Sequence, residues 1–250
     1  MQILRSICLI LIISVIGFGC DNINNLTPDQ LTNKGRQLYE QGKFDDAVKL
    51  FKRAIQLKPT SAEIHFELGV MYYQEWKRSL DQAQKKILEE TIVDGKKYDG
   101  ADNEKLLLRK GYRKELLGFA MDEFDAVLKY DPSNWKARYH IAVNFLNNKK
   151  YDKAIVEFKK VIEIEPKDSN SYSLLGKAYM EAGQYRLAIK PLEKAVGMDP
   201  GVENYYFLGM AYKNLNNWKK VGEISQKLKE RDTMRYSMLI DPLNVSPGNL

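Results

Sequence analysis

The chain has 250 residues, of which 44% are hydrophobic and 29% charged, a balance typical of a folded protein. The net charge is +6, but acidic residues lie beside basic ones along most of the chain, which indicates solvated helix faces and not a nucleic-acid site. The chain contains only two cysteines, Cys8 and Cys20, and two histidines, His65 and His140. These counts are too low for a disulfide framework or for the usual Cys and His ligands of a zinc site.

The N-terminal residues have the pattern of an export signal. Arg5 precedes a run over residues 7–18 that is apolar except for one serine. A membrane-spanning helix needs about 20 apolar residues, so this run is too short to span a bilayer and fits the core of a signal peptide. The run ends in Gly-Phe-Gly followed by Cys20.

Small residues before a cysteine at this place resemble the lipobox of bacterial lipoproteins. The resemblance implies that residues 1–19 are a signal peptide, that Cys20 is lipidated, and that residues 20–27 are the lipidated cysteine and a linker. One position departs from the pattern, because Gly17 stands where Leu or a similar aliphatic residue is usual. An uncleaved anchor and a signal cut elsewhere are the alternatives. All three would export the protein. The lipoprotein interpretation places it in the bacterial cell envelope, lipid-anchored and facing the periplasm, with inner or outer membrane left open.

Prolines mark an internal repeat of 34 residues. Pro132, Pro166 and Pro200 follow one another at intervals of 34, and Pro59 precedes Pro132 by 73, which is one repeat with 39 extra residues. Before each of three prolines, small and large apolar residues stand at successive steps of 3, 9, 4, 3 and 5. In the unit that ends at Pro166 these residues are Ala142, Phe145, Ala154, Phe158 and Val161.

This pattern resembles the tetratricopeptide repeat (TPR). Each unit also has the three- and four-residue apolar spacing of two amphipathic helices, and the proline ends the second helix. The resemblance implies an all-α fold, a right-handed TPR superhelix made of helix pairs, over residues 28–232. We expect five repeats in that range and a C-terminal tail over residues 233–250. The expected repeats are 28–61, 62–134, 135–168, 169–201 and 202–232.

The second repeat carries an insertion at about residues 74–112. Tyr73, Trp76, Leu80, Ala83 and Ile87 follow steps of 3, 4, 3 and 4, which is the spacing of a coiled-coil seam. A second apolar stripe follows the insertion, so we expect both helices of this repeat to continue as a long antiparallel hairpin. The hairpin is a docking arm for a partner, a spacer or an arm that folds back on the repeats, or a self-association surface.

The first helix of each repeat lines the concave groove in tetratricopeptide proteins, and the resemblance carries this role to specific positions. An apolar and aromatic lining suits an extended or helical peptide. Thr32, Arg36, Met180 and Lys213 share this face but are not assigned to binding. The residues expected to bind a peptide are Phe66, Val70, Tyr73, Tyr139, Val143, Leu146, Ser173, Lys177, Tyr206 and Met210.

No motif of a hydrolase, nucleotide-binding enzyme or metalloprotease occurs in the chain. We therefore expect no enzymatic activity, no cofactor, no metal, no nucleic-acid partner and no small-molecule substrate. The expected function is a membrane-anchored scaffold or adaptor that binds partner proteins or peptides and assists assembly of an envelope complex. The alternative is a regulatory adaptor that docks a cell-wall hydrolase or a protease.

Overall fold

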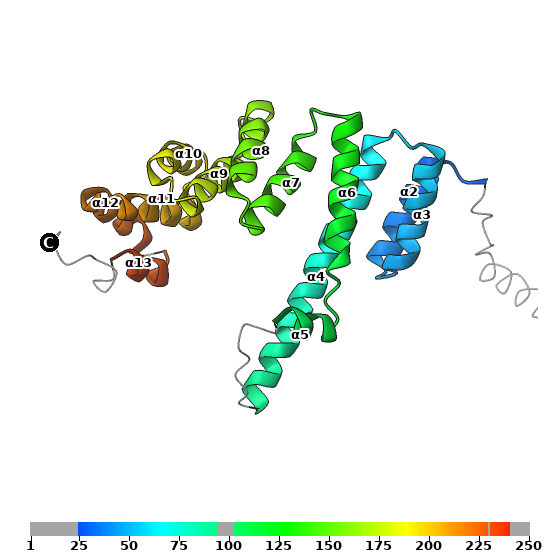
Figure 1. Cartoon of the computed structure of the whole chain (residues 1–250), viewed down its shortest axis with the longest axis horizontal. Coiled ribbons are helices and arrows are strands. Elements are labelled where there is room, and N and C mark those ends of the chain that lie inside the picture. The colour runs from blue at the N-terminus through cyan, green and yellow to red at the C-terminus, as the bar shows by residue number, and fades with distance from the viewer. Residues whose placement is uncertain (1–24, 95–102, 230, 241–250) are drawn as a thin grey trace, which may run out of the picture. The chain divides into compact units, whose positions relative to one another are not determined.

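A computed structural model describes residues 25–94, 103–229 and 231–240. The expected signal peptide and Cys20 lie outside the described residues, so the signal peptide and the lipidation of Cys20 stay predictions. Within the described ranges all regular structure is helical, and the helices follow one another in pairs, which confirms the expected all-α solenoid of helix pairs (Figure 1). The chain divides into two compact units, Met1–Arg113 and Lys114–Leu250.

The first unit contains the first repeat and most of the insertion. Its helices are α2 (Pro28–Glu40), α3 (Phe44–Leu57), α4 (Ala62–Asp94) and α5 (Asn103–Arg109). Thr27 begins α2 with a capping box, in which its hydroxyl accepts from the Gln30 backbone and Gln30 Oε1 accepts from the Thr27 backbone. The helices α2 and α3 pack closely because Gly35 presents no side chain to the buried ring of Phe51.

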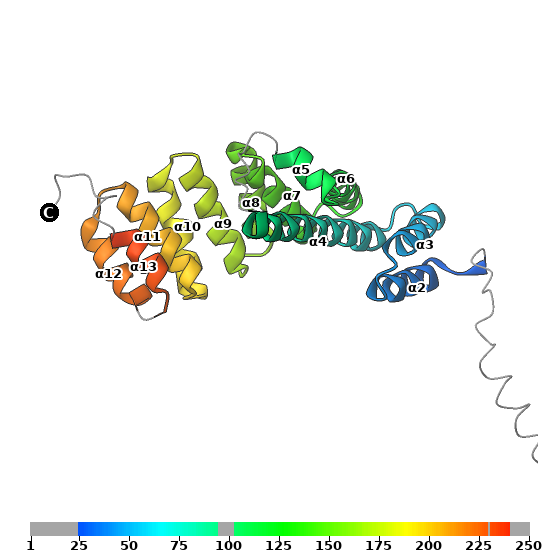
Figure 2. The same cartoon turned by 90° about the horizontal axis from the view of Figure 1, so that it is seen from below.

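The second unit contains three complete helix pairs. A core of small and large apolar residues, among them Phe158 and Leu192, runs through these pairs. Its helices, which lie beside one another in chain order in Figures 1 and 2, are α6 (Glu115–Tyr130), α7 (Trp135–Asn147), α8 (Tyr151–Ile164), α9 (Ser169–Glu181), α10 (Tyr185–Met198), α11 (Val202–Asn214), α12 (Trp218–Lys229) and α13 (Thr233–Ile240).

The turn inside each helix pair has one residue in the left-handed region. Gly42 and Gly183 fill this position in two pairs, with φ of 76° and 72°. Lys149 and Asn216 fill it in the others, with φ of 58° and 57°. Asparagine adopts the left-handed conformation more readily than most residues, whereas the same conformation is energetically unfavourable for lysine. The repeat therefore imposes the same turn geometry whether or not glycine is present.

The insertion only partly follows the expected hairpin. Helix α4 runs unbroken for 33 residues, which confirms the outgoing arm. The expectation of a continuous returning helix is wrong, because α5 ends at Arg109 and Gly111 has a φ of 98°, which no helix accommodates. The interrupted segment is held to α4 by hydrogen bonds from Trp76 Nε1 to the Tyr112 hydroxyl, 2.9 Å, and from the Arg113 backbone to Ser79 Oγ, 3.1 Å.

The last described helix, α13, falls in the segment expected to be a tail. Asp232 caps it, with Oδ1 accepting from the Arg235 backbone at 2.9 Å. Leu239 is fully buried, and its side chain lies against Gly209 of α11. The tail thus contributes a helix that covers the last pair, while residues 241–250 lie outside the described residues.

Candidate peptide-binding face

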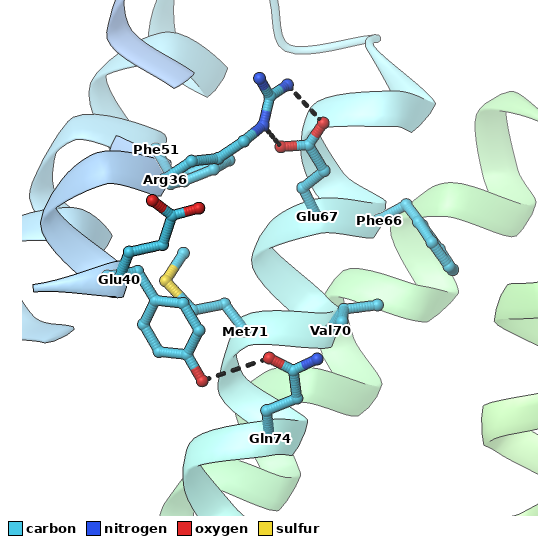
Figure 3. A pocket seen from close by; sticks show the side chains of 9 residues that line it. Arg36, Glu40, Phe51, Phe66, Glu67, Val70, Met71 and Gln74 are labelled. Carbon is cyan, nitrogen blue, oxygen red and sulfur yellow. Dashed lines mark hydrogen bonds and ion pairs between the residues drawn. The ribbon is translucent and has the colours of Figure 1, made fainter. Parts of the chain in front are cut away.

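An open pocket of 280 Å³ lies between α2 and α4, the first helices of the first two repeats. Figure 3 shows Met71 directed toward α2, whereas Phe66 and Val70 are directed away from it and form the outer edge. The pocket is therefore mainly apolar and opens on the face where the sequence placed a groove. Its lining residues are Arg36, Tyr39, Glu40, Phe51, Phe66, Glu67, Val70, Met71 and Gln74.

A bidentate ion pair closes one end of this pocket. Arg36 Nε donates to Glu67 Oε2 at 2.8 Å, and Arg36 Nη2 donates to Glu67 Oε1 at 2.7 Å. The hydrogen bonds to Glu67 raise the pKa of Arg36, although burial opposes this shift, so the guanidinium stays charged. This pair joins the first helices of two repeats and cancels both charges at that end of the pocket (Figure 3).

A neutral hydrogen bond closes the other end. The Tyr39 hydroxyl donates to Gln74 Oε1 at 3.2 Å, and Arg78 lies over the Tyr39 ring with its Cζ 5.5 Å from the centroid. Burial raises the pKa of Tyr39, so this phenol remains a hydrogen-bond donor at neutral pH. The two polar ends leave an apolar centre formed by Met71, Phe51 and the edge residues.

The structure places the ten predicted binding residues on the first helices, but not all of them are accessible. Leu146 and Ser173 are only 7% and 6% exposed, so neighbouring helices cover most of both side chains, and their role in binding stays a prediction. Thr32 is likewise buried, with Oγ1 donating to the Asp29 carbonyl at 3.0 Å. The other eight predicted residues are half-buried, and their role in binding stays a prediction.

Tyr73 lies on α4 beyond the pocket. Its ring stacks obliquely on Trp76, with centroids 5.3 Å apart, and burial raises its pKa. In the second unit the Tyr139 ring packs edge-on against the buried ring of Phe158, 6.1 Å between centroids. Part of the surface of each of these rings is therefore buried in contacts with neighbouring aromatic residues.

In the second unit, two of the contacts between a cation and an aromatic ring involve residues predicted to bind a peptide. Lys177 Nζ is 5.4 Å from the centroid of Phe207, and Arg235 Cζ is 5.8 Å from that of Tyr206. The second contact comes from α13, which also meets Tyr206 through a hydrogen bond from its hydroxyl to Met238 Sδ, 3.6 Å. The face of α11 that the sequence assigned to a ligand is therefore partly covered by the chain itself.

His140 lies between repeats. Its ring stacks on Phe124, with centroids 4.6 Å apart and an interplanar angle of 5°. Burial lowers its pKa to about 4, so the ring is neutral at physiological pH. These contacts place His140 among the packing residues between α6 and α7.

Sequence reasoning placed Arg36 on the groove face but did not assign it to binding, and it missed Tyr39, Glu67 and Gln74. Glu67 and Gln74 lie one position beyond the predicted residues Phe66 and Tyr73, on the side of α4 that faces α2. Only the packing angle of the two helices decides which side of α4 meets its neighbour. The spacing of residues along the sequence does not predict the ion pair between Arg36 and Glu67.

Neither a membrane-spanning helix nor a metal-holding cluster occurs in the described ranges. No helix in those ranges combines the length and the hydropathy needed to cross a bilayer. In the same ranges, no group of three or more His, Cys, Asp or Glu residues lies close enough together to hold a metal ion.

Known families match much of the chain. Residues 35–75 and 120–169 match tetratricopeptide repeat families, and residues 147–228 match the family described as anaphase-promoting complex, cyclosome, subunit 3. Superkiller protein 3 of Schizosaccharomyces pombe is 36% identical over 101 residues, covering 39% of this chain and 7% of the relative. The BBSome complex member BBS4 of Bos taurus is 28% identical over 223 residues, covering 82% of this chain and 40% of the relative.

Both relatives are much longer than the part of them that this chain matches. Among solved structures, MamA 41-end from Desulfovibrio magneticus RS-1 resembles the chain with a TM-score of 0.57 and 19% identity, covering 82% of this chain and 97% of that chain. At 19% identity, this structural similarity supports the assignment of the fold and carries no information on function. The repeat families, the 34-residue period and the paired helices agree, and the chain is a tetratricopeptide repeat protein.

Proposed function

We propose that the chain is a non-enzymatic scaffold, anchored to a membrane of the bacterial cell envelope, that binds partner proteins or peptides and assists assembly of an envelope complex. The pocket between α2 and α4 is the observation that carries the binding part of this proposal. It lies on the first-helix face, it is mainly apolar, and its charges at one end are already paired. Such a pocket suits an apolar anchor side chain of a peptide.

The lining also favours a particular kind of anchor. A volume of 280 Å³ accommodates one large side chain such as leucine or phenylalanine. The Arg36–Glu67 pair is neutral overall, whereas Glu40 is exposed at the end of α2, where helix carbonyls add negative potential. The expected ligand is therefore a large apolar residue with a basic residue close to it in the peptide.

Names of the relatives are consistent with a scaffold. One is called a member of the BBSome complex, and a matching family is named for a subunit of the anaphase-promoting complex. Assembly with other proteins is thus a property that we propose for this chain as well. The chain spans less than half of either relative reported above, so their particular partners are not carried over.

Site-specific photocrosslinking in cells tests the binding face. A photoreactive residue at Val70, on the edge of the pocket, should form an adduct with a partner protein. The control is Val156, which is 49% exposed on α8 and belongs to a second helix. An adduct that forms at Val70 and disappears in the Glu67→Lys variant supports the proposal. Adducts of equal yield at both positions, or an adduct at Val156 with none at Val70, would contradict the proposal.

The membrane anchor rests on the sequence of the first 20 residues. Replacing Cys20 by serine should abolish incorporation of labelled palmitate and release the protein from the membrane fraction. Wild-type protein that carries no label, or a Cys20→Ser variant that still sediments with membranes, would refute the lipid anchor. Neither result would alter the proposal for the pocket, because the two rest on different parts of the chain.

A further inference from the structure

A second pocket, of 590 Å³, lies where α8, α9 and α10 meet in the second unit. Four of its six lining residues belong to α10, the second helix of its pair, so the pocket is separate from the first-helix positions that were predicted to bind a peptide. Its volume is about twice that of the pocket between α2 and α4, so it accommodates more than one side chain of a ligand. The lining residues are Ile162, Tyr172, Lys190, Pro191, Glu193 and Lys194.

Three helices contribute the apolar part of this lining. Ile162, Tyr172 and Pro191 are all half-buried, so each keeps part of its surface accessible to a ligand. Pro191 has no N–H and cannot donate to the carbonyl of Leu187, so its position inside α10 costs the helix one hydrogen bond. The neighbouring Leu192 is fully buried and makes the core contact of this turn. The ring of Pro191 therefore gives the pocket a rigid apolar wall next to the core.

Two lysines bring positive charge to the same pocket. Lys190 and Lys194 are four residues apart, so they lie on the same side of α10, and both are exposed. Neither has a hydrogen-bond or ion-pair partner among the described residues. Arg186 stands one turn before Lys190 and extends the row of cations along α10. Because like charges at this spacing repel one another on a helix, an anionic ligand placed along the row would relieve the repulsion.

The lining also contains one acidic side chain, Glu193, which is already engaged by a neighbouring helix. The Tyr212 hydroxyl of α11 donates to Glu193 Oε1 at 2.7 Å. Burial and this hydrogen bond raise the pKa of Tyr212 to about 12, so the phenol stays a donor at neutral pH. The carboxylate is thus held toward α11, and the lining keeps a net positive charge from the two lysines.

We propose that this pocket docks an acidic segment of a partner protein, which inserts one large apolar side chain between Ile162 and Pro191 and places Asp or Glu side chains on the two lysines. Charge complementarity and the apolar walls carry the argument. The Tyr172 hydroxyl, which has no hydrogen-bond partner among the described residues, adds a donor for a carboxylate. A protein segment fits better than a membrane surface, because the apolar walls lie inside a concave pocket that a side chain enters and a layer of headgroups does not.

This site goes beyond the proposed function, because it adds a second docking surface on the second-helix side of the repeats. Its ligand is acidic, whereas the peptide expected at the pocket between α2 and α4 carries a basic residue. All of its lining residues lie in the second unit, and the other pocket lies in the first. The Glu67→Lys variant should therefore leave binding at this site unchanged, so that failure of either proposal can be told from failure of the other.

The test measures binding of a labelled peptide to the full chain by fluorescence anisotropy. The probe is Glu-Asp-Glu-Leu-Asp-Glu with fluorescein at its N-terminus and an amidated C-terminus, so that no terminal carboxylate contributes. We expect saturable binding that weakens as the salt concentration rises. A peptide with serine in place of the leucine should bind about tenfold more weakly, the effect of burying one leucine side chain. Absence of binding, or equal binding of the two peptides, would overturn the proposal.

Two matched double variants separate the pocket from a general attraction between opposite charges. Lys190→Gln combined with Lys194→Gln should lower the affinity about tenfold, the effect of two exposed ion pairs. Lys219→Gln combined with Lys227→Gln removes the same charge from α12 and should leave the affinity unchanged. All four lysines are exposed, so neither change should disturb the fold. Equal weakening by both double variants would contradict a specific site on α10.

A photoreactive form of the probe locates the bound peptide. With benzoylphenylalanine in place of the leucine, mass spectrometry should find the adduct on α8 or α10, near Ile162 or Pro191. An adduct confined to α7 or α11 would overturn the assignment to this pocket.

A membrane surface is the other anionic partner that the two lysines could meet. Sedimentation with phosphatidylglycerol vesicles tests it, with the full chain carrying Cys20→Ser so that no lipid anchor contributes. Vesicle binding should be the same in the double variants of α10 and α12. Loss of vesicle binding in the α10 variant alone would assign its lysines to a lipid surface and overturn the proposal.

Discussion

Gly176 of α9 lies directly against Leu192 of α10, and a Cβ added at Gly176 would come within 2.6 Å of Leu192 Cδ2. Leu192 is fully buried, and protein interiors are packed closely enough that a side chain in the core has little room to move. The close approach of these two helices therefore depends on the absence of a side chain at this position. The same relationship recurs between Gly35 and Phe51 in the first unit, where the corresponding distance is 2.7 Å.

Gly176→Ala should destabilise the second unit by about 1–3 kcal/mol, because it overpacks the contact between α9 and α10. The control is Gly222→Ala on α12, where an added Cβ meets nothing within 4 Å and should stabilise the helix by about 0.5–1 kcal/mol. Urea unfolding followed by circular dichroism measures both. Two variants of equal stability would contradict the close-packing argument.

Leu239→Ala should detach α13 from the last helix pair. Leu239 is fully buried against Gly209, so its truncation should cost about 2–4 kcal/mol locally. Hydrogen exchange should then accelerate in α11 and α13. The neighbouring Ile240 is 40% exposed, and Ile240→Ala should leave exchange nearly unchanged. Similar exchange in both variants would mean that α13 does not cover this pair in solution.

Acidification should destabilise the second unit through His140. Burial lowers its pKa to about 4, whereas the unfolded chain titrates near 6.5. The unfolded state therefore binds more protons between these values, so the stabilisation is fully present above pH 6.5 and is lost as the pH falls toward 4. A shift of this size corresponds to roughly 3 kcal/mol.

His140→Phe keeps a ring against Phe124 but cannot take up a proton. The difference in unfolding free energy between this variant and wild type should therefore change between pH 7 and pH 4, in favour of the variant at low pH. Subtracting the two profiles removes the contribution of the carboxylates, which titrate in both proteins. A difference that stays constant over this range would refute the prediction.

Glu157→Gln should weaken the contact between α7 and α8. Arg138 Nη1 donates to Glu157 Oε2 at 2.7 Å, and both side chains are mostly buried, 14% and 17% exposed. Burial raises the pKa of Glu157, but the hydrogen bonds from Lys160 and Arg138 outweigh it and leave the pKa lowered. Because solvent still screens part of the pair, we expect a loss of about 1–2 kcal/mol at neutral pH.

The control for this variant is Glu223→Gln, which breaks the exposed i,i+3 pair with Lys220 on α12. An exposed pair on one helix contributes little, so no measurable change is expected. The loss in Glu157→Gln should also disappear as the pH falls, because the carboxylate of the wild type is then protonated. Equal losses from the two variants at neutral pH would contradict the argument.

The sequence alone determined the repeat, the pairing of helices along the chain and most of the core. The 34-residue period fixed where each second helix ends, and small residues such as Gly176 marked where helices approach closely. These features are local or periodic, so they can be read from spacing. The sequence also assigned Leu146 and Ser173 to the groove face, but it did not indicate that the packing of the helices leaves them only 7% and 6% exposed.

The tertiary structure decided the features that depend on two elements far apart in the chain. Arg36 and Glu67 pair because the angle between α2 and α4 brings those two sides together, and no spacing rule states that angle. The returning arm of the insertion breaks at Gly111, and α13 folds over α11 because Leu239 finds an apolar site beside Gly209. Periodicity predicts which residues share a helix face, whereas the packing of helices decides which faces meet and which pockets remain between them.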